Sequence, residues 1–195
     1  PQEIASIEGI DNSVNEITGF SISDNGIGLD ENNMRSFLQS DSTYRAEKGG
    51  KGVGRFSWLK AFSSAKVESI YKDDDVWVKR EFEFSLDNLD IDDTLTEVHD
   101  ISDNCTVVEL VDYLPTYRKN VSKNPEVIAT KIMQHCLIYL MSPNCPIISI
   151  IDDERYCIND MFEKRIKREE SNVEIEVGGK IFSLLNTKVE DSSVG

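Results

Sequence analysis

The residues with the clearest chemical potential stand in two glycine clusters. The first is Asp24-Asn25-Gly26-Ile27-Gly28, and the second is Gly49-Gly50-Lys51-Gly52-Val53-Gly54. Glycine costs backbone entropy and is placed where φ must be positive or where another group must approach the main chain closely. Two such clusters in one segment therefore indicate a binding site rather than packing.

The second cluster has the features of an anion site. It leads into Arg55 to Ala65, where Phe56, Leu59 and Phe62 have helical spacing. A glycine-rich turn before a helix directs free N–H groups and the positive end of the helix dipole at one point. Phosphate is the expected occupant, with Lys51 as a mobile point charge beside it.

The first cluster supplies a different contact. Asp24 follows the alternating strand Ile17 to Ser23, and a turn at Gly26 and Gly28 comes next. A buried carboxylate at that strand end could accept a hydrogen bond from the exocyclic amine of adenine. It would be the one polar anchor of an otherwise apolar base pocket.

Other glycine-rich motifs fail on spacing. A P-loop needs glycine where Arg45 stands, before Gly50. The dinucleotide fingerprint and the kinase loop both need glycine at the position of Arg55. A calcium loop that starts at Asp24 needs an oxygen ligand at its third position, which is Gly26.

The pair of clusters resembles the gyrase, chaperone, histidine-kinase and MutL superfamily of ATPases, called GHKL. The first cluster is similar to the first glycine box of that family, and the resemblance makes Asp24 the adenine-binding aspartate. The second is similar to the box that ends the ATP lid. The resemblance assigns nucleotide binding to Asp24, Asn25, Gly26, Gly28, Gly50, Lys51, Gly52, Val53, Gly54, Arg55 and Thr106.

The last of these stands in Cys105 to Leu110, which resembles the family's late Gly-Thr strand. In that strand the threonine lies near the adenine and its aspartate. Here Cys105 replaces the usual glycine before Thr106. The residues Asp112 to Lys119 resemble the exit from the ATPase domain in MutL-like and chaperone-like members. A histidine kinase fits less well, because such kinases usually end soon after this strand.

The resemblance implies an α+β fold: a two-layer α/β sandwich, the Bergerat ATP-binding fold, followed by part of a second α/β domain. Residues 1–124 are expected to form the ATP-binding domain without its N-terminal helix. Residues 125–195 are expected to form a linking helix and a partial transducer-like domain. The implied cofactors are ATP and Mg²⁺. The implied activity is slow Mg-dependent ATP hydrolysis, which drives lid closure and a clamp-like change in a homodimer formed through the full-length N-terminal region.

Family members carry a Glu-x-x-x-Asn motif before the first box, in which the glutamate activates water and the asparagine binds magnesium. Glu8 and Asn12 have this spacing. Gly9 weakens a helix there, and little chain separates Asn12 from Asp24, so a hairpin turn is the alternative to a catalytic pair. The true motif is then expected upstream of Pro1. A chain without that glutamate would be inactive, or a nucleotide-sensing module that does not hydrolyse.

Composition limits the partners and the compartment. The chain has 195 residues and a formal net charge of −15, which argues against nucleic acid as a partner. No apolar run reaches the length of a membrane span, and no signal peptide is visible. Four cysteines without C-x-x-C spacing predict reduced core thiols in a cytoplasmic protein, with a disulfide or metal role as the alternative.

Hydrophobic periodicity predicts the elements around these motifs. Helices are expected over residues 30–38, 55–65 and 125–141, the last with Asn124 as its N-cap. Strands are expected over residues 17–23, 66–71, 76–85, 95–99, 105–110, 147–151, 156–158, 173–177 and 180–185. Ser40 to Lys48 is predicted to form a mobile lid, with an ordinary solvated loop as the alternative. The basic run Lys164 to Arg168 is predicted to be a solvated face, with an anion-binding patch as the alternative.

Overall fold

The structure is a computed structural model that describes residues 17–39, 56–88, 91–142, 144–165 and 170–187. The chain divides into two compact units, Pro1–Lys123 and Asn124–Gly195. Within the described ranges, no helix has the length and apolar character needed to cross a bilayer. The four cysteines are free and partly buried, as the sequence predicts for reduced thiols.

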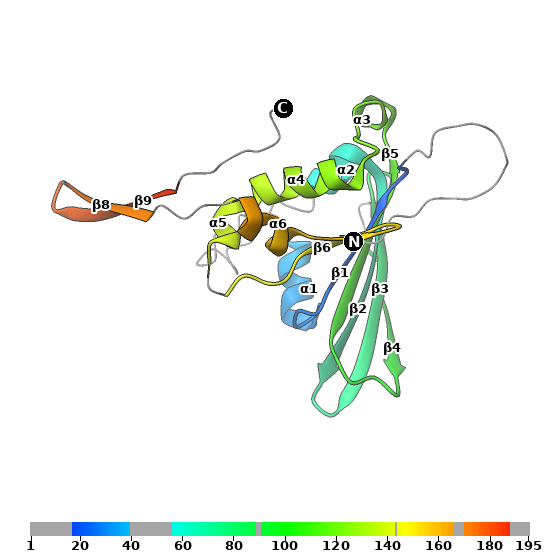
Figure 1. The fold of residues 1–195 in the computed structure, drawn as a ribbon. Coiled ribbons are helices and arrows are strands. Elements are labelled where there is room, and N and C mark those ends of the chain that lie inside the picture. The colour runs from blue at the N-terminus through cyan, green and yellow to red at the C-terminus, as the bar shows by residue number, and fades with distance from the viewer. Residues whose placement is uncertain (1–16, 40–55, 89–90, 143, 166–169, 188–195) are drawn as a thin grey trace. The chain divides into compact units, whose positions relative to one another are not determined.

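The first unit is built on a five-stranded antiparallel sheet with the strand order β1-β5-β2-β3-β4. Its strands are β1 (Phe20–Asp24), β2 (Phe62–Asp73), β3 (Val76–Ser85), β4 (Thr94–Val98) and β5 (Cys105–Tyr113). Its helices are α1 (Glu31–Leu38), α2 (Phe56–Ala61) and α3 (Pro115–Arg118). Separate helices beside an antiparallel sheet confirm the predicted α+β class (Figure 1).

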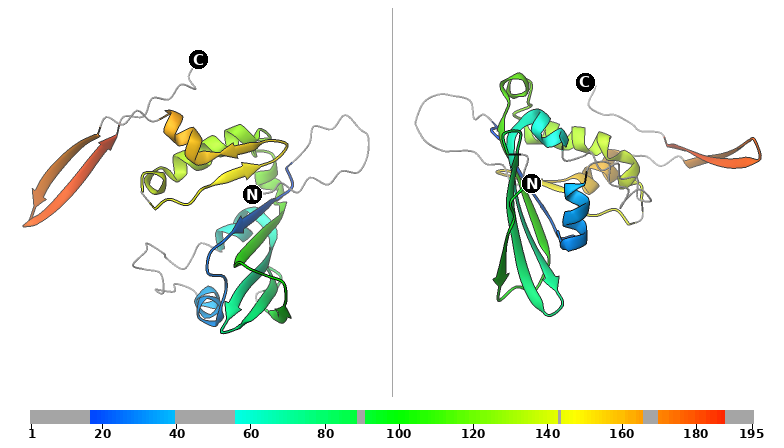
Figure 2. Two further views of the ribbon diagram at one scale, coloured as in Figure 1. Left: turned by 60° about the horizontal axis from the view of Figure 1, so that its bottom comes forward. Right: turned by 180° about the vertical axis from the view of Figure 1, so that it is seen from behind.

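Helices α1 and α2 cover one face of this sheet (Figure 2). Met34 of α1 packs on Val67 and Phe82, while Phe62 and Leu110 form a neighbouring buried cluster. On the strands, buried residues alternate with partly exposed charged ones, because successive side chains point to opposite faces. Among the described residues of this unit, the sheet therefore has a helix-covered face and an open face.

The helix predicted over residues 55–65 is wrong at its C-terminal end. Helix α2 ends at Ala61, and Phe62 begins β2 by pairing with Tyr113 of β5. The rings of Phe62 and Tyr113 have centroids 4.2 Å apart. Pairing with a distant strand overrides the local helical spacing, which is a weak preference compared with tertiary packing.

The second unit contains helices α4 (Pro125–His135), α5 (Leu137–Leu140) and α6 (Ile158–Arg165), with a short hairpin of β6 (Ser149–Ile151) and β7 (Arg155–Cys157). The oxygen Oδ1 of Asn124 accepts N–H bonds from Glu126 and Val127, which confirms the predicted N-cap. The single helix predicted over residues 125–141 is interrupted at Cys136. Helix α6 was not predicted, and its Phe162 is buried in the core of this unit.

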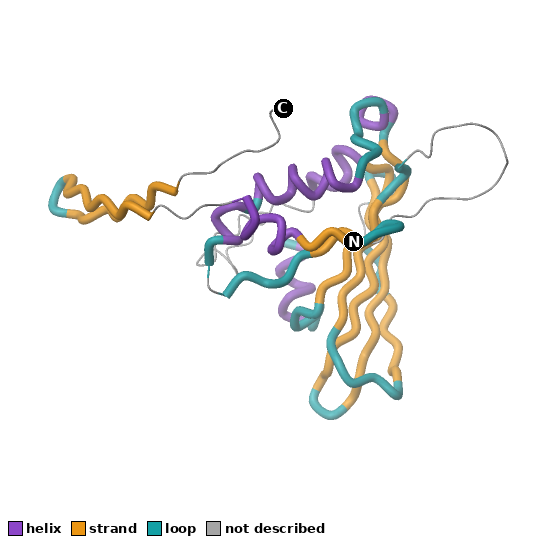
Figure 3. The backbone as a smooth tube through the Cα atoms, in the orientation of Figure 1, coloured by secondary structure: helices purple, strands orange, loops and turns teal. Residues whose placement is uncertain are grey.

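A separate hairpin pairs β8 (Glu170–Val177) with β9 (Lys180–Thr187). The tight turn at Gly178 and Gly179 is the one the sequence predicts. Figure 3 shows this hairpin as two strands joined by a short turn.

Candidate functional site

The candidate site lies where β1 ends at Asp24. The carboxylate oxygen Oδ1 of Asp24 accepts the N–H of Gly26 at 2.7 Å. A Cβ at Gly26 would lie 2.7 Å from that oxygen, so a larger residue there would displace the carboxylate from this turn. The sequence predicted a buried carboxylate, whereas Asp24 is exposed with respect to the described residues. Helix α1 packs through Met34 on Val67 and Phe82.

Thr106 stands directly beside Asp24. The two residues are partners across the antiparallel pair of β1 and β5, so their side chains project from the same face. That face is the helix-covered one, and Thr106 is 8 % exposed. The structure thus brings together the aspartate and the threonine that the sequence places far apart in the chain.

Behind Thr106 lies a serine that the sequence reading missed. The hydroxyl of Ser69 on β2 is 3.0 Å from the hydroxyl of Thr106 and accepts the N–H of Leu29 at 2.8 Å. Ser69 is completely buried. A signal was present in the sequence, because Ser69 is a polar residue at a core-facing position between Val67 and Tyr71.

The position of Gly28 in this cluster requires glycine, because any side chain would clash with its neighbours. Its φ is +82°, and a Cβ there would lie 2.7 Å from the Cβ of Tyr71 and 3.1 Å from the hydroxyl oxygen of Ser69. Its carbonyl accepts a hydrogen bond from the amide of Asn33, a buried residue of α1, at 3.0 Å. The sequence reading assigned no role to Asn33, which ties the glycine turn to the helix.

Arg80 of β3 is the largest buried polar side chain near the turn, and the sequence reading also missed it. Its guanidinium donates to the carbonyl of Asp30 at 3.3 Å and to the carboxylate of Glu31 at 3.0 Å. Its Nε lies 3.0 Å from Asp93, but this contact is an ion pair without hydrogen-bond geometry. Burial raises the pKa of the neighbouring Tyr71, and the positive charge of Arg80 opposes that shift.

Apolar side chains stand beside the single carboxylate. Ile22 lies on the same face as Asp24 and is 41 % exposed, and Ile27 in the turn is 64 % exposed. An apolar surface with one acidic group suits a flat heteroaromatic ring that carries a hydrogen-bond donor. Asn25 is exposed in the same turn.

The remaining residues assigned by the resemblance lie outside the described part of the chain. They are Gly50, Lys51, Gly52, Val53, Gly54 and Arg55 of the second cluster, and Glu8 and Asn12 of the catalytic pair. The predicted lid, Ser40 to Lys48, lies there too. The structure therefore describes the base-binding half of the predicted site.

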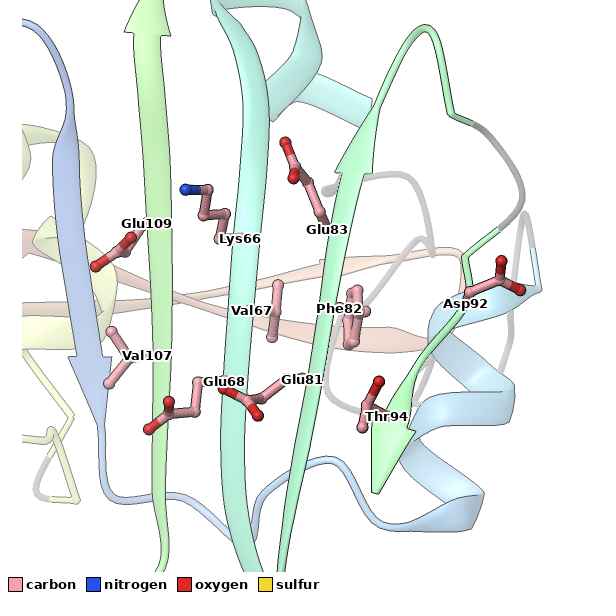
Figure 4. A pocket seen from close by; sticks show the side chains of 10 residues that line it. All are labelled: Lys66, Val67, Glu68, Glu81, Phe82, Glu83, Asp92, Thr94, Val107 and Glu109. Carbon is pink, nitrogen blue, oxygen red and sulfur yellow. The ribbon is translucent and has the colours of Figure 1, made fainter. Parts of the chain in front are cut away.

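A hollow of about 490 Å³ lies on the open face of the sheet (Figure 4), opposite the face from which Asp24 projects. The acidic residues that line it are Glu68, Glu81, Glu83, Asp92 and Glu109, and the lining also includes the basic Lys66. This surplus of carboxylates would repel a phosphate. The hollow is therefore not a candidate for a nucleotide. Across the described ranges, no group of three side chains is arranged to hold a metal ion.

Comparison with known proteins adds no family to this geometry. No protein-family model and no curated protein matches the chain. Function is therefore inferred from the side chains around Asp24.

Proposed function

We propose that this chain binds an adenine nucleotide, ATP with Mg²⁺, at the end of β1 in the manner of the GHKL ATPases. One observation carries the proposal. Asp24 and the glycine turn at Gly28 meet the hydroxyl of Thr106, which comes from a distant strand, at one end of the sheet. The resemblance assigns Asp24 and Thr106 to the adenine and Gly28 to the first glycine box of the nucleotide site.

The chemistry of the cluster favours adenine over guanine at this position. One oxygen of Asp24 is engaged by the Gly26 N–H, and the carboxylate has further acceptor sites. The exocyclic amine of adenine is a donor that matches such an acceptor. Guanine presents a carbonyl oxygen at the equivalent position, and that oxygen would face a negative charge. Ile22 and Ile27 offer the apolar contact for the ring.

The proposal extends from the base to the phosphates through the second glycine cluster. Gly50 to Arg55 would hold the phosphates, with Lys51 as a charge, and the preceding lid would close over them. Slow hydrolysis driving a clamp-like change in a homodimer needs a glutamate base and a magnesium-binding asparagine, for which Glu8 and Asn12 are the candidates in this chain. Without them, the same site is a nucleotide sensor that does not hydrolyse.

The test is calorimetric titration of the chain with a non-hydrolysable ATP analogue. We expect a dissociation constant on the order of micromolar or weaker, and a loss of about tenfold to a hundredfold in Asp24→Asn, because a hydrogen bond to a charged acceptor is removed. Asp87→Asn, which changes an exposed aspartate of the β3–β4 connection, should bind as the wild type does. Equal affinity in Asp24→Asn would exclude the adenine role.

A phosphate-release assay with ATP and Mg²⁺ then separates the enzyme from the sensor. Turnover that is lost in Glu8→Gln would identify Glu8 as the base. Binding without turnover in the wild-type chain would favour the sensor.

A further inference from the structure

The hydroxyl of Ser69 occupies a position that only a tertiary structure reveals. It is completely buried between two elements of the proposed site, the glycine turn and β5. On one side it accepts the N–H of Leu29 at 2.8 Å, the residue after Gly28. On the other side it lies 3.0 Å from the hydroxyl of Thr106.

The direction of the hydrogen bond between the two hydroxyls follows from their surroundings. Ser69 has one hydrogen to donate, and Thr106 is the hydroxyl partner that the structure places within reach of it. A buried O–H without an acceptor is costly. Thr106 is slightly exposed, so its own hydrogen can be used by solvent or by a ligand. Donation from Ser69 to Thr106 is the direction that satisfies both hydroxyls, although the distance alone allows either atom to donate.

We infer that Ser69 is a positioning residue for the nucleotide base: it orients the hydroxyl of Thr106 so that this group presents a donor beside the Asp24 acceptor. The inference rests on the proposed function. A donor next to an acceptor is complementary to the edge of adenine, which carries an amine and a ring nitrogen. Ser69 thereby acts on specificity without touching the ligand.

The same hydroxyl couples the base contact to the glycine turn. Leu29 follows Gly28, whose carbonyl is held by Asn33 of α1. Removal of the Ser69 hydroxyl would release both the Leu29 N–H and the rotamer of Thr106. A positioning role can be distinguished from simple packing. If Ser69 only fills space, the loss of affinity on replacing it would be the same with or without the Thr106 hydroxyl.

A double-mutant cycle on the full chain tests the inference, with the non-hydrolysable ATP analogue as the probe. Ser69→Ala and Thr106→Val should each weaken binding by about threefold to tenfold, the range of one net hydrogen bond. The double variant should lose less affinity than the sum of the two single losses, because part of the Ser69 effect passes through Thr106. Ser64→Ala, on the opposite face of the same strand, is the matched control and should bind like the wild type.

Two results would overturn the inference: unchanged affinity in Ser69→Ala, or additive losses in the double variant. Ser69→Cys provides a second route if the alanine variant does not fold. The thiol is a weak donor, so this variant should bind more weakly than the wild type, and wild-type affinity would count against the inference. Loss of binding in Asp24→Asn with none in the Ser69 variants would refute the positioning role alone. Retained binding in Asp24→Asn would refute the proposed function itself.

Discussion

Lys79 and Arg80 are neighbours on β3, yet they belong to two different surfaces. Lys79 projects from the open face, where its side chain is 27 % exposed and forms ion pairs with Glu81 on its own strand and Glu68 on the next. Arg80 projects under α1, is 2 % exposed and contacts Glu31 of α1 and Asp93, which precedes β4. The open face holds local, solvated pairs, whereas the covered face uses each polar group to join distant segments.

This difference explains where the candidate site lies. Solvated charges on the open face can exchange partners with little cost. On the covered face, the polar groups of Ser69, Asn33 and Thr106 have defined partners around the glycine turn. A defined arrangement of donors and acceptors is what recognition of a base requires, because an unpaired buried group penalises the wrong ligand.

The largest expected effect comes from removing Arg80. Arg80→Met should lower the free energy of unfolding by about 2–4 kcal/mol, because it breaks a buried ionic contact. The loss is not larger because the two carboxylates left behind are partly exposed to water. Urea unfolding followed by circular dichroism measures this. Arg80→Lys keeps the charge but loses the planar fork, and it should recover only part of the loss. If Arg80→Met is as stable as the wild type, removal of a charged side chain costs as little on the covered face as on the open face, and the contrast between the two faces is wrong.

A smaller effect is expected from Tyr113, at the other end of the covered face. Burial raises the pKa of Tyr113 to about 12. The unfolded chain loses this proton near the ordinary value of about 10, so between these values the native state binds more protons. Stability must therefore fall as the pH rises through that range.

Replacement of the phenol isolates this contribution. Between about pH 9 and about pH 11, the wild type should lose about 1 kcal/mol more stability than Tyr113→Phe, allowing for the partial exposure of the ring. Urea titrations at both pH values provide the comparison. Parallel losses in the two proteins would mean that the hydroxyl of Tyr113 titrates normally.

The smallest effect is expected on the open face. A hydrogen bond from Lys79 to Glu81 raises the pKa of Lys79, with the charge of Glu68 contributing in the same direction. Lys79→Met should nevertheless change the urea midpoint by only a small fraction of the Arg80→Met shift, and added salt should remove the difference, because exposed ion pairs are screened. A loss that persists at high salt would contradict the contrast between the two faces.

Much of the site's local structure could be predicted from the sequence, but not its supporting residues. The end of the strand at Asp24, the turn with Gly28 and the strand with Thr106 follow from glycine placement and period-two alternation. Ser69 and Arg80 were missed, because a polar residue on a core-facing position has meaning only when its partner is known. The exposure of Asp24 was also missed, because burial at the end of a strand depends on the tertiary packing around it.

The sequence by itself determined the elements with short-range causes: the alternating strands, the cap at Asn124 and the glycine turn that joins β8 to β9. Only the tertiary structure decided that β1 pairs with β5 and β5 with β2, an arrangement that sets Asp24, Thr106 and Ser69 in one row across the sheet. The physical reason is the distance along the chain between the residues that interact. Capping and turn formation depend on neighbouring residues, whereas strand pairing selects among distant segments through the burial of a whole face.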